Sequence, residues 1–231
     1  VAHGPAPETG ARRRPGTHPR RPGVTAVARL RADFYDRPTL DVLSELIGKV
    51  LVHDVRGAPT AGIIVEAEAY IGESDPACHA APGPTARNAP LYGPPGRAYV
   101  YLNYGLHHLV NAVTEPAGSP AAILIRALEP VDGIARMRRR RLRAREAPGR
   151  RSTTPGRPLP EAHLCRGPGN LTVALGITLR ENTADLTRGP LTIEDHGVQA
   201  PAVRWSARIG IRVGTDRLWR CTWEGHPSVS R

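Results

Sequence analysis

Apolar positions near the start of the patterned part of the chain recur at helical spacing. Pro38 suits a first helical turn and Gly48 suits the exit, so we expect a short helix between them, with folded sequence beginning near Leu30. The apolar face of this helix consists of Leu40, Leu43 and Ile47.

Apolar runs bounded by turn residues predict strands through much of the remaining chain. The expected strands are residues 50–55, 61–70, 98–104, 106–113, 121–127, 202–213 and 218–223, and the sequence from Leu191 onward also favours strand. The strands at 98–104 and 106–113 meet at Gly105, which predicts a hairpin. Polar sequence rich in proline and glycine separates 61–70 from this hairpin.

Two further helices complete the pattern. Gly167-Pro168-Gly169 begins a short one, and Pro130 opens a longer one whose arginines either form a solvated face or attract a phosphate backbone. The arginines of the longer helix are Arg136, Arg138, Arg139, Arg140, Arg141, Arg143 and Arg145. Because strands and helices do not alternate regularly, we expect an α+β fold, a single compact domain with a curved, largely antiparallel sheet flanked by helices.

Two segments have compositions unsuited to a packed core. Residues 1–27 are rich in proline, glycine and arginine, so we expect a disordered basic N-terminal tail before a domain that spans 28–231. Residues 147–160 combine several prolines and glycines and are expected to form a mobile loop.

The charge of the chain favours phosphate-rich partners. The 231 residues carry a formal net charge of +11 and a pI near 10.7. No apolar run approaches the roughly 20 residues of a membrane span, and no apolar signal segment is evident at the N-terminus. Cys78, Cys165 and Cys221 are widely spaced with no CxxC pattern, which predicts reduced thiols, a cytoplasmic location and no metal site.

Tyrosines gather in one part of a chain that is poor in aromatic residues. Aromatic residues make up 4% of the sequence, and the clustered tyrosines are Tyr70, Tyr92, Tyr99, Tyr101 and Tyr104. Beside carboxylates in a basic protein, this cluster suggests a site that grips a nucleobase. A tyrosine at the hairpin tip has little core to pack against and can wedge between bases or stack on one.

Charged residues in two of the predicted strands are candidates for chemistry. In the first, Glu66, Glu68 and Tyr70 share a face, with the two carboxylates about 7 Å apart. This face is either a functional one or a solvated edge of the sheet. The alternation of the strand does not indicate which of the two carboxylates would be catalytic. In the second, Arg126 lies among apolar residues and needs either a structural ion-pair partner or an opening onto a cavity. Gly167 offers free backbone N–H groups to a phosphate.

Taken together, these segments resemble the alkyladenine (3-methyladenine) DNA glycosylase family. The matching segments are VEAEAYIGESDPACHA (65–80), TARNAPLYGPPGRAYVYLNYGLHHLVNAV (85–113), ILIRALEP (123–130), LCRGPGNLTVALGI (164–177) and ARIGI (207–211). They occur in order and with compatible spacing from about Leu30 to Ser230, and the tail before Leu30 lies outside the resemblance.

The resemblance implies a monomeric enzyme without cofactor or metal, which flips a damaged purine out of double-stranded DNA and hydrolyses its N-glycosidic bond. By position, it implies that Glu68 activates the attacking water and that Arg126 and the backbone carbonyl of Ile209 hold this water. It further implies that Tyr70 and Tyr101 stack on the flipped base.

The resemblance also implies roles around the base and along the DNA. His79 lines the base pocket, and Asn111 stands where the family screens out the 2-amino group of guanine. Tyr104 fills the gap that the base leaves, while Arg87 and the helix start at Gly167 meet the DNA backbone. Tyr92 and Tyr99 are expected to be loop or core residues. Asn170 stands where the family often has a basic residue, which bears on one phosphate contact and not on the chemistry.

The lysine content predicts the type of glycosylase. Lys49 is the only lysine, and it lies in the apolar run 47–52, away from the matching segments. Because glycosylases that also cut the strand use an amine nucleophile, we expect no lyase activity.

Two rival functions differ in class from this one. A non-catalytic nucleic-acid-binding protein would use the same charge and tyrosines, but it would leave the Glu68 strand without a purpose. A metal-dependent hydrolase would have to assemble its ligands from Glu66, Glu68, Asp75 and His79.

Overall fold

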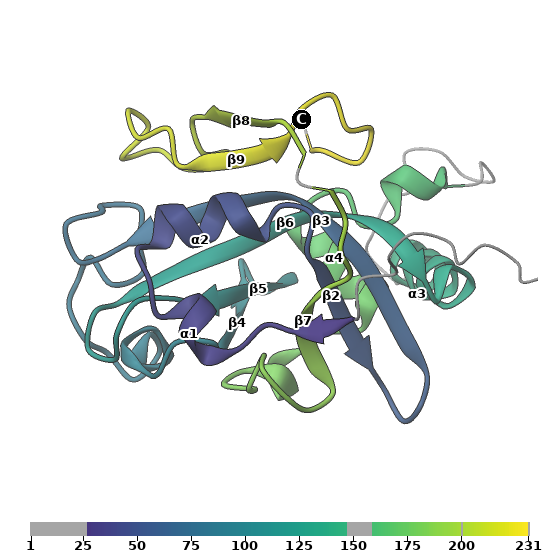
Figure 1. The fold of residues 1–231 in the computed structure, drawn as a ribbon, viewed down its shortest axis with the longest axis horizontal. Coiled ribbons are helices and arrows are strands. Elements are labelled where there is room, and N and C mark those ends of the chain that lie inside the picture. The colour runs from purple at the N-terminus through teal and green to yellow at the C-terminus, as the bar shows by residue number, and fades with distance from the viewer. Residues whose placement is uncertain (1–26, 147–158, 200, 231) are drawn as a thin grey trace, which may run out of the picture.

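One antiparallel sheet organises the chain in the computed structural model, which describes residues 27–146, 159–199 and 201–230 (Figure 1). Its strands are β1 (Ala28–Arg29), β2 (Val50–Asp54), β3 (Pro59–Ile71), β4 (Ala98–Asn103), β5 (His107–Val113), β6 (Ala121–Asp132), β7 (Leu191–Asp195), β8 (Val203–Ser206) and β9 (Arg220–Trp223). The main order is β1-β7-β2-β3-β6-β5-β4, and the β8–β9 hairpin joins the sheet where β9 pairs with β3. Every strand pair is antiparallel, so the expected α+β class is confirmed.

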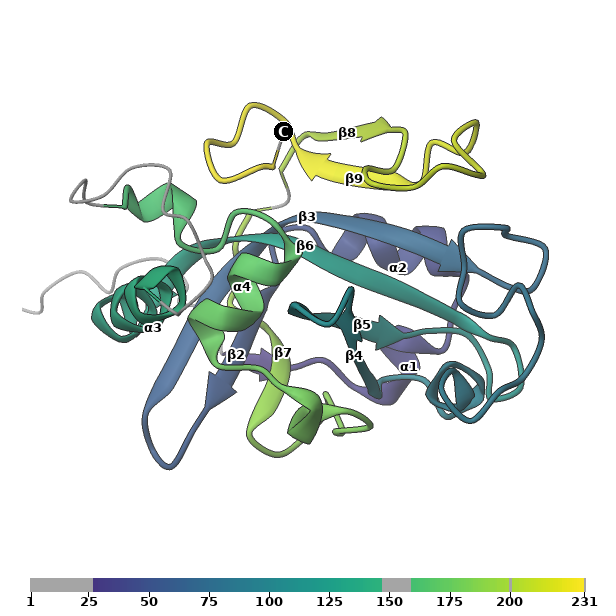
Figure 2. The same cartoon turned by 180° about the vertical axis from the view of Figure 1, so that it is seen from behind.

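Helices cover both faces of the central strands. They are α1 (Ala32–Tyr35), α2 (Thr39–Leu46), α3 (Ile134–Glu146) and α4 (Pro168–Leu175), with 3-10 turns η1 (Ala89–Tyr92), η2 (Glu161–His163) and η3 (Leu179–Glu181). Figures 1 and 2 show α2 over one face of β3 and β6 and α4 over the other. The α2 side chains Val42, Leu43 and Leu46 are fully buried, as are Leu171 and Leu175 of α4. The core therefore forms on both sides of the two longest strands.

Two irregularities in the β3–β6 ladder shape the region of the predicted site. β3 pairs with β2 up to Ile63 and with β9 from Glu66 to Glu68. Along β6, the register shifts leave Val65 of β3 and Arg126 of β6 without an opposite residue. Such bulges re-aim side chains. They turn Arg126 toward the face of β3 that carries the two carboxylates.

Most predicted elements are confirmed, and two are wrong. Pro130 does not open a helix, because β6 continues to Asp132 and α3 begins only after Gly133. Proline is tolerated there because β5 pairs with β6 only at residues 122–124 and the contacts of β6 with Cys165 and Arg166 reach only Leu128, so Pro130 lies on the edge of β6 beyond both. The strand expected at 202–213 ends at Ser206, since the chain turns at Gly210 and Gly214, which have φ of 80° and 62°.

The arginine-rich helix α3 is partly structural. Arg136, Arg138 and Arg140 donate hydrogen bonds to the backbone carbonyls of Pro59, Leu159 and Ala174, respectively. Ala174 lies in the last turn of α4, where a cation is favourable. These three arginines therefore hold neighbouring segments together and do not form a uniformly solvated face.

The tail predicted at 1–27, apart from Val27, and residues 147–158 of the predicted loop lie outside the described residues. Within the described ranges, none of the helices has the length and apolar character needed to cross a membrane.

Candidate active site

The two carboxylates of β3 form a buried charge cluster with Arg126. Glu66 and Glu68 are 0% exposed, and Arg126 is 7% exposed. Arg126 Nε lies 2.8 Å from Glu66 Oε1, and its Nη1 lies 3.1 Å from Glu68 Oε2. The solvated-edge alternative is therefore wrong, and Arg126 has both an ion-pair role and access to a cavity.

Glu66 is saturated with donors. Besides Arg126, it accepts hydrogen bonds from Arg220 Nε at 2.8 Å and from the Ser230 backbone N–H at 2.7 Å and hydroxyl at 2.8 Å. Burial alone would raise the pKa of Glu66, but Arg126, Ser230 and Arg220 together outweigh it and hold the pKa below its ordinary value. Glu66 is an ionised structural anchor: both of its oxygens accept donors from the protein, its side chain is fully buried, and it does not line the cavity described below.

Glu68 has a different environment, although it lies only two residues along the strand. Its Oε1 accepts the Ile209 N–H at 2.7 Å, and its Oε2 accepts the Tyr70 hydroxyl at 2.9 Å. Burial raises the pKa of Glu68 above its ordinary value, against the opposing effects of Arg126, Ile209 and Tyr70. A carboxylate whose pKa is shifted toward neutrality suits a general base.

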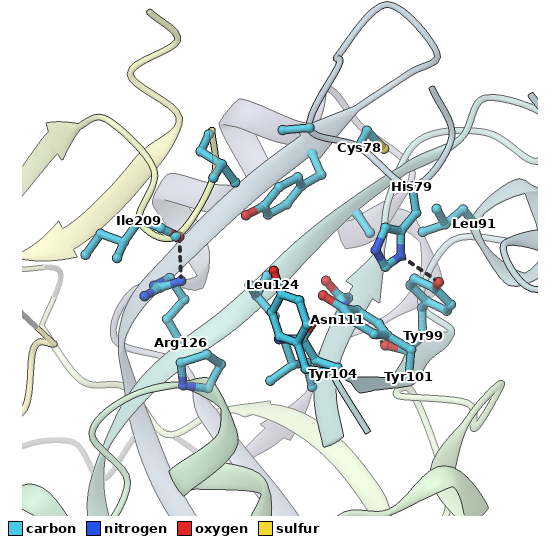
Figure 3. Close-up of a pocket in the computed structure, with 18 residues that line it drawn as sticks. Cys78, His79, Leu91, Tyr99, Tyr101, Tyr104, Asn111, Leu124, Arg126 and Ile209 are labelled. Carbon is cyan, nitrogen blue, oxygen red and sulfur yellow. Dashed lines mark hydrogen bonds between the residues drawn. The ribbon is translucent and has the colours of Figure 1, made fainter. Parts of the chain in front are cut away.

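A cavity of about 420 Å³ is lined by residues that bind Glu68, while Glu68 itself is buried behind them and is not part of the lining (Figure 3). Most of the residues implied for base binding and catalysis line it, namely Tyr70, His79, Tyr101, Tyr104, Asn111, Arg126 and Ile209. Glu68 is joined to three of these, through Tyr70, Arg126 and Ile209. In Figure 3, Arg126 and Ile209 lie on one side of the cavity, and His79, Tyr99 and Tyr101 lie on the other.

The aromatic wall of the cavity is tied together by one hydrogen bond. His79 Nδ1 lies 2.9 Å from the Tyr99 hydroxyl, and the rings of His79 and Tyr101 are 4.5 Å apart. Burial, with the nearby charge of Arg87, lowers the pKa of His79, which favours the neutral imidazole. Tyr99 is a core residue as expected, but it also orients His79, a role that its shared strand face with Tyr101 could have signalled.

Asn111 is buried in the cavity wall with its amide nitrogen engaged. Its side-chain NH₂ donates to the Tyr99 carbonyl at 2.9 Å, across the β4–β5 pair. This hydrogen bond fixes the plane of the amide at the edge of the cavity.

Tyr104 lies at the tip of the β4–β5 hairpin in a strained conformation. Its side chain is 88% exposed, and its φ is +48°, with Gly105 at +67°. Two central residues with positive φ form a type I′ turn, closed here by the Leu106 N–H and the Asn103 carbonyl at 3.0 Å. A non-glycine residue in this region costs about 1–2 kcal/mol, and an exposed tyrosine gains no packing in return.

Arg87 and Gly167, which are implied for backbone contact, lie next to the cavity but do not line it. Arg87 is exposed on the loop that begins after His79, and neighbouring Asn88 fixes this loop by donating to the His79 carbonyl at 2.7 Å. Gly167 caps the start of α4 with φ of 92°. Asn170 folds back on the Arg166 carbonyl at 2.6 Å. Its amide nitrogen is therefore engaged within the helix start.

The residues of the metal-hydrolase alternative do not gather around one point. Asp75 is held by Arg208, with 2.5 Å between Asp75 Oδ2 and Arg208 Nη1. Glu66 is bound by Arg126, Arg220 and Ser230, and His79 by Tyr99. Across the described part of the chain, no group of three or more His, Cys, Asp or Glu side chains is arranged to hold a metal ion.

Arg208 is the residue of the site that sequence reasoning missed. Its side chain is fully buried, and its guanidinium lies 4.6 Å from the centre of the Tyr70 ring. It directly precedes Ile209, so the matching segment 207–211 contained the signal.

Comparison with known proteins agrees with this geometry. The family model described as methylpurine-DNA glycosylase matches residues 33–227. A relative from Chlorobium phaeobacteroides is 45% identical and aligns over 83% of this chain and 90% of its own. One from Methanocella arvoryzae is 44% identical over 86% and 94%, and one from Burkholderia lata is 42% identical over 94% and 97%. All three carry the name "Putative 3-methyladenine DNA glycosylase". The chain belongs to the methylpurine-DNA glycosylase family and is a DNA glycosylase, a hydrolase of N-glycosyl bonds.

Proposed function

We propose that this DNA glycosylase flips alkylated or deaminated purines out of duplex DNA and excises them with a water molecule activated by Glu68, leaving an abasic site. The observation that carries the proposal is the contrast between two neighbouring buried carboxylates. Of the two, only Glu68 has a raised pKa, and only Glu68 is hydrogen-bonded to Tyr70 and Ile209 of the cavity lining. The names of the relatives are consistent with a damaged purine as substrate.

The proposed reaction requires few groups. Glu68 accepts a proton from water as the water oxygen bonds to the sugar C1′, while the electron pair of the glycosidic bond leaves with the base. Arg126 Nη1 lies 3.1 Å from Glu68 and 3.5 Å from the Ile209 carbonyl. The carboxylate, the cation and the carbonyl can therefore orient the same water from different sides.

The cavity suits an electron-poor purine. Tyr70 and Tyr101 supply aromatic surface, on which a cationic or electron-poor base is favourably stacked. A neutral His79 that accepts the Tyr99 hydroxyl at Nδ1 carries its proton on Nε2 and can donate it to an acceptor on the base. Asn111 offers a fixed amide for discrimination in the same wall, where it is bound to the Tyr99 carbonyl.

The exposed hairpin tip and the basic residues of the chain bind the DNA. Tyr104 fills the space left by the flipped nucleotide and offsets part of the cost of flipping, which is a few kcal/mol. Arg87 and the α4 start at Gly167 contact backbone phosphates. Because a single chain supplies every proposed group, we propose that the enzyme acts as a monomer.

The position of Lys49 supports a monofunctional enzyme. Its ammonium group pairs with Asp195 at 2.6 Å, in the β2–β7 region, and it is not among the residues that line the cavity. Borohydride should therefore trap no covalent complex on abasic DNA, and a specific cross-link at Lys49 would contradict this proposal.

The decisive experiment is single-turnover excision from duplexes that contain hypoxanthine, 3-methyladenine, 7-methylguanine or ethenoadenine. We expect release of a free base and an abasic site, with activity that survives EDTA. Glu68→Gln should bind the damaged duplex without releasing the base. If the wild-type protein binds these duplexes but releases no base from any of them, the proposal of purine excision is wrong.

A further inference from the structure

The buried ion pair between Arg208 and Asp75 lies directly behind the cavity wall. Both side chains are 0% exposed, and the guanidinium binds the carboxylate through two nitrogens, at 2.5 Å and 2.8 Å. The same guanidinium donates to the Ala69 carbonyl at 3.0 Å and to the Gly214 carbonyl at 3.3 Å. This bidentate geometry requires the planar fork of arginine and is not available to lysine.

Three separate parts of the candidate site converge on this pair. Arg208 stacks on the Tyr70 ring at the end of β3, at 4.6 Å. Asp75 accepts the Ala77 N–H at 3.2 Å, and its backbone carbonyl accepts the Cys78 N–H at 2.9 Å, in the segment that leads to His79. Arg208 is also joined covalently to Ile209, whose N–H binds Glu68 and whose carbonyl faces Arg126.

We propose that Arg208 is a positioning residue for base excision, whose bidentate pairing with Asp75 fixes the Tyr70 ring and the Ile209 backbone relative to Glu68. The proposal rests on the function proposed above. Arg208 touches neither the base nor the water. It acts by holding the Ile209 N–H on the carboxylate and the Tyr70 ring in the cavity wall.

Neighbouring Arg217 provides a matched control for this role. Its Nη1 also lies near Asp75, at 3.7 Å, and its guanidinium also stacks on Trp219, at 4.6 Å, much as Arg208 does at 5.2 Å. Arg217 is partly exposed, and it contacts Asp75, Ser74 and Trp219 but neither Tyr70 nor Ile209. The two arginines therefore share a carboxylate and a tryptophan but differ in their access to the site.

The test compares Arg208→Lys with Arg217→Lys in the full-length protein on a hypoxanthine duplex. Three quantities are measured for each: the affinity for undamaged duplex, the single-turnover excision rate across pH, and the thermal unfolding midpoint. We expect Arg208→Lys to bind undamaged DNA like the wild type while its rate falls about 10- to 100-fold, since small displacements of a reacting group have effects of this size. Arg217→Lys should excise at the wild-type rate.

The pH profile separates positioning from loss of folding. The charged groups that interact with Glu68 are Arg126, Arg208 and Glu66, together with the Tyr70 hydroxyl and the Ile209 N–H, and Arg208→Lys keeps the positive charge. Because the Ile209 hydrogen bond favours the ionised carboxylate, loosening it raises the pKa of Glu68. The acid limb of the Arg208→Lys rate should therefore move to higher pH, whereas partial unfolding would lower the rate equally at all pH values.

Asp75→Asn should reproduce the shift, since it removes the charge that orients the guanidinium. An unshifted acid limb in both Arg208→Lys and Asp75→Asn, or an equal shift in Arg217→Lys, would overturn the proposal. Wild-type protein on the same duplex is the reference, so a failure of the proposed excision itself would be evident before any variant is compared.

Discussion

Glu66 and Glu68 lie two residues apart on the same strand, yet their surroundings shift their pKa values in opposite directions. Glu66 faces β9 and the C-terminal segment, where Arg220 and Ser230 join Arg126 in holding its charge. Glu68 lies behind the cavity wall, bound to the cavity-lining residues Tyr70 and Ile209, and there burial prevails over Arg126 and raises its pKa. One carboxylate holds the arginine in place, and the other has the raised pKa that the proposed proton transfer requires.

The largest expected effect in this comparison is on the rate after Glu68→Gln. General-base groups contribute about 10²- to 10⁴-fold, so single-turnover excision should fall by at least about 10²-fold. Because a raised pKa means that the folded protein disfavours the charged form, the unfolding midpoint should be unchanged or slightly higher. Stopped assays with radiolabelled duplex measure the rate, and calorimetry measures the midpoint. A variant that is both inactive and strongly destabilised would show that Glu68 is an anchor like Glu66.

Glu66→Gln should show the converse. Removing one partner of a buried ion pair costs about 3–5 kcal/mol, because the remaining charges are left uncompensated. Chemical denaturation should therefore show a large loss in the free energy of unfolding. The fraction that stays folded should keep a rate closer to the wild type than that of Glu68→Gln. If Glu66→Gln is the inactive variant and Glu68→Gln is active, the general base is Glu66, two residues before the one assigned.

The excision rate and the stability of the fold should depend on pH over different ranges, because each is controlled by a different one of the two carboxylates. Glu66 has a lowered pKa, so its contribution to stability is fully present above the ordinary value of about 4.3 and is lost only as the pH falls through its lower folded pKa. Glu68 has a raised pKa, so the acid limb of kcat/KM should lie above that value. Acidification should therefore abolish activity while the protein is still folded. Loss of rate and of near-ultraviolet circular dichroism at the same pH would contradict the comparison.

The alternation of side chains along a strand was sufficient to place Glu66 and Glu68 on one face. The two apolar runs that meet at Gly105 were sufficient to predict the hairpin with Tyr104 at its tip. It could not distinguish the carboxylates, because their difference comes from Ile209, Arg220 and Ser230, which are distant in sequence. The resemblance selected Glu68, and the contacts supply a physical reason. The bulge that aims Arg126 at both carboxylates depends on strand register, which is not encoded by local periodicity.

The errors in the predicted elements have a similar origin. Pro130 carries a strong local signal for a helix start, yet pairing with Gly62 keeps it in β6. The segment after Ser206 has an apolar pattern typical of a strand. However, the buried ion pair of Arg208 with Asp75 and the hydrogen bond from the Ile209 N–H to Glu68 hold it in a turn. In both cases a contact with a distant residue outweighs the local preference.

The smallest expected effect lies at the hairpin tip, outside both carboxylate regions. Tyr104 has a φ of +48° and is 88% exposed, so its conformation is unfavourable without compensating contacts. Asparagine tolerates this conformation better than tyrosine, and Tyr104→Asn should stabilise the free protein by up to about 1 kcal/mol. The same variant should excise more slowly from a fully paired duplex than from one with an unpaired lesion, where flipping costs less. The acid limb of its rate should stay at the wild-type pH, because Tyr104 does not contact Glu68. A shifted acid limb would mean that the hairpin tip and the carboxylate pair are coupled, and that the contrast between Glu66 and Glu68 is not set by their immediate neighbours alone.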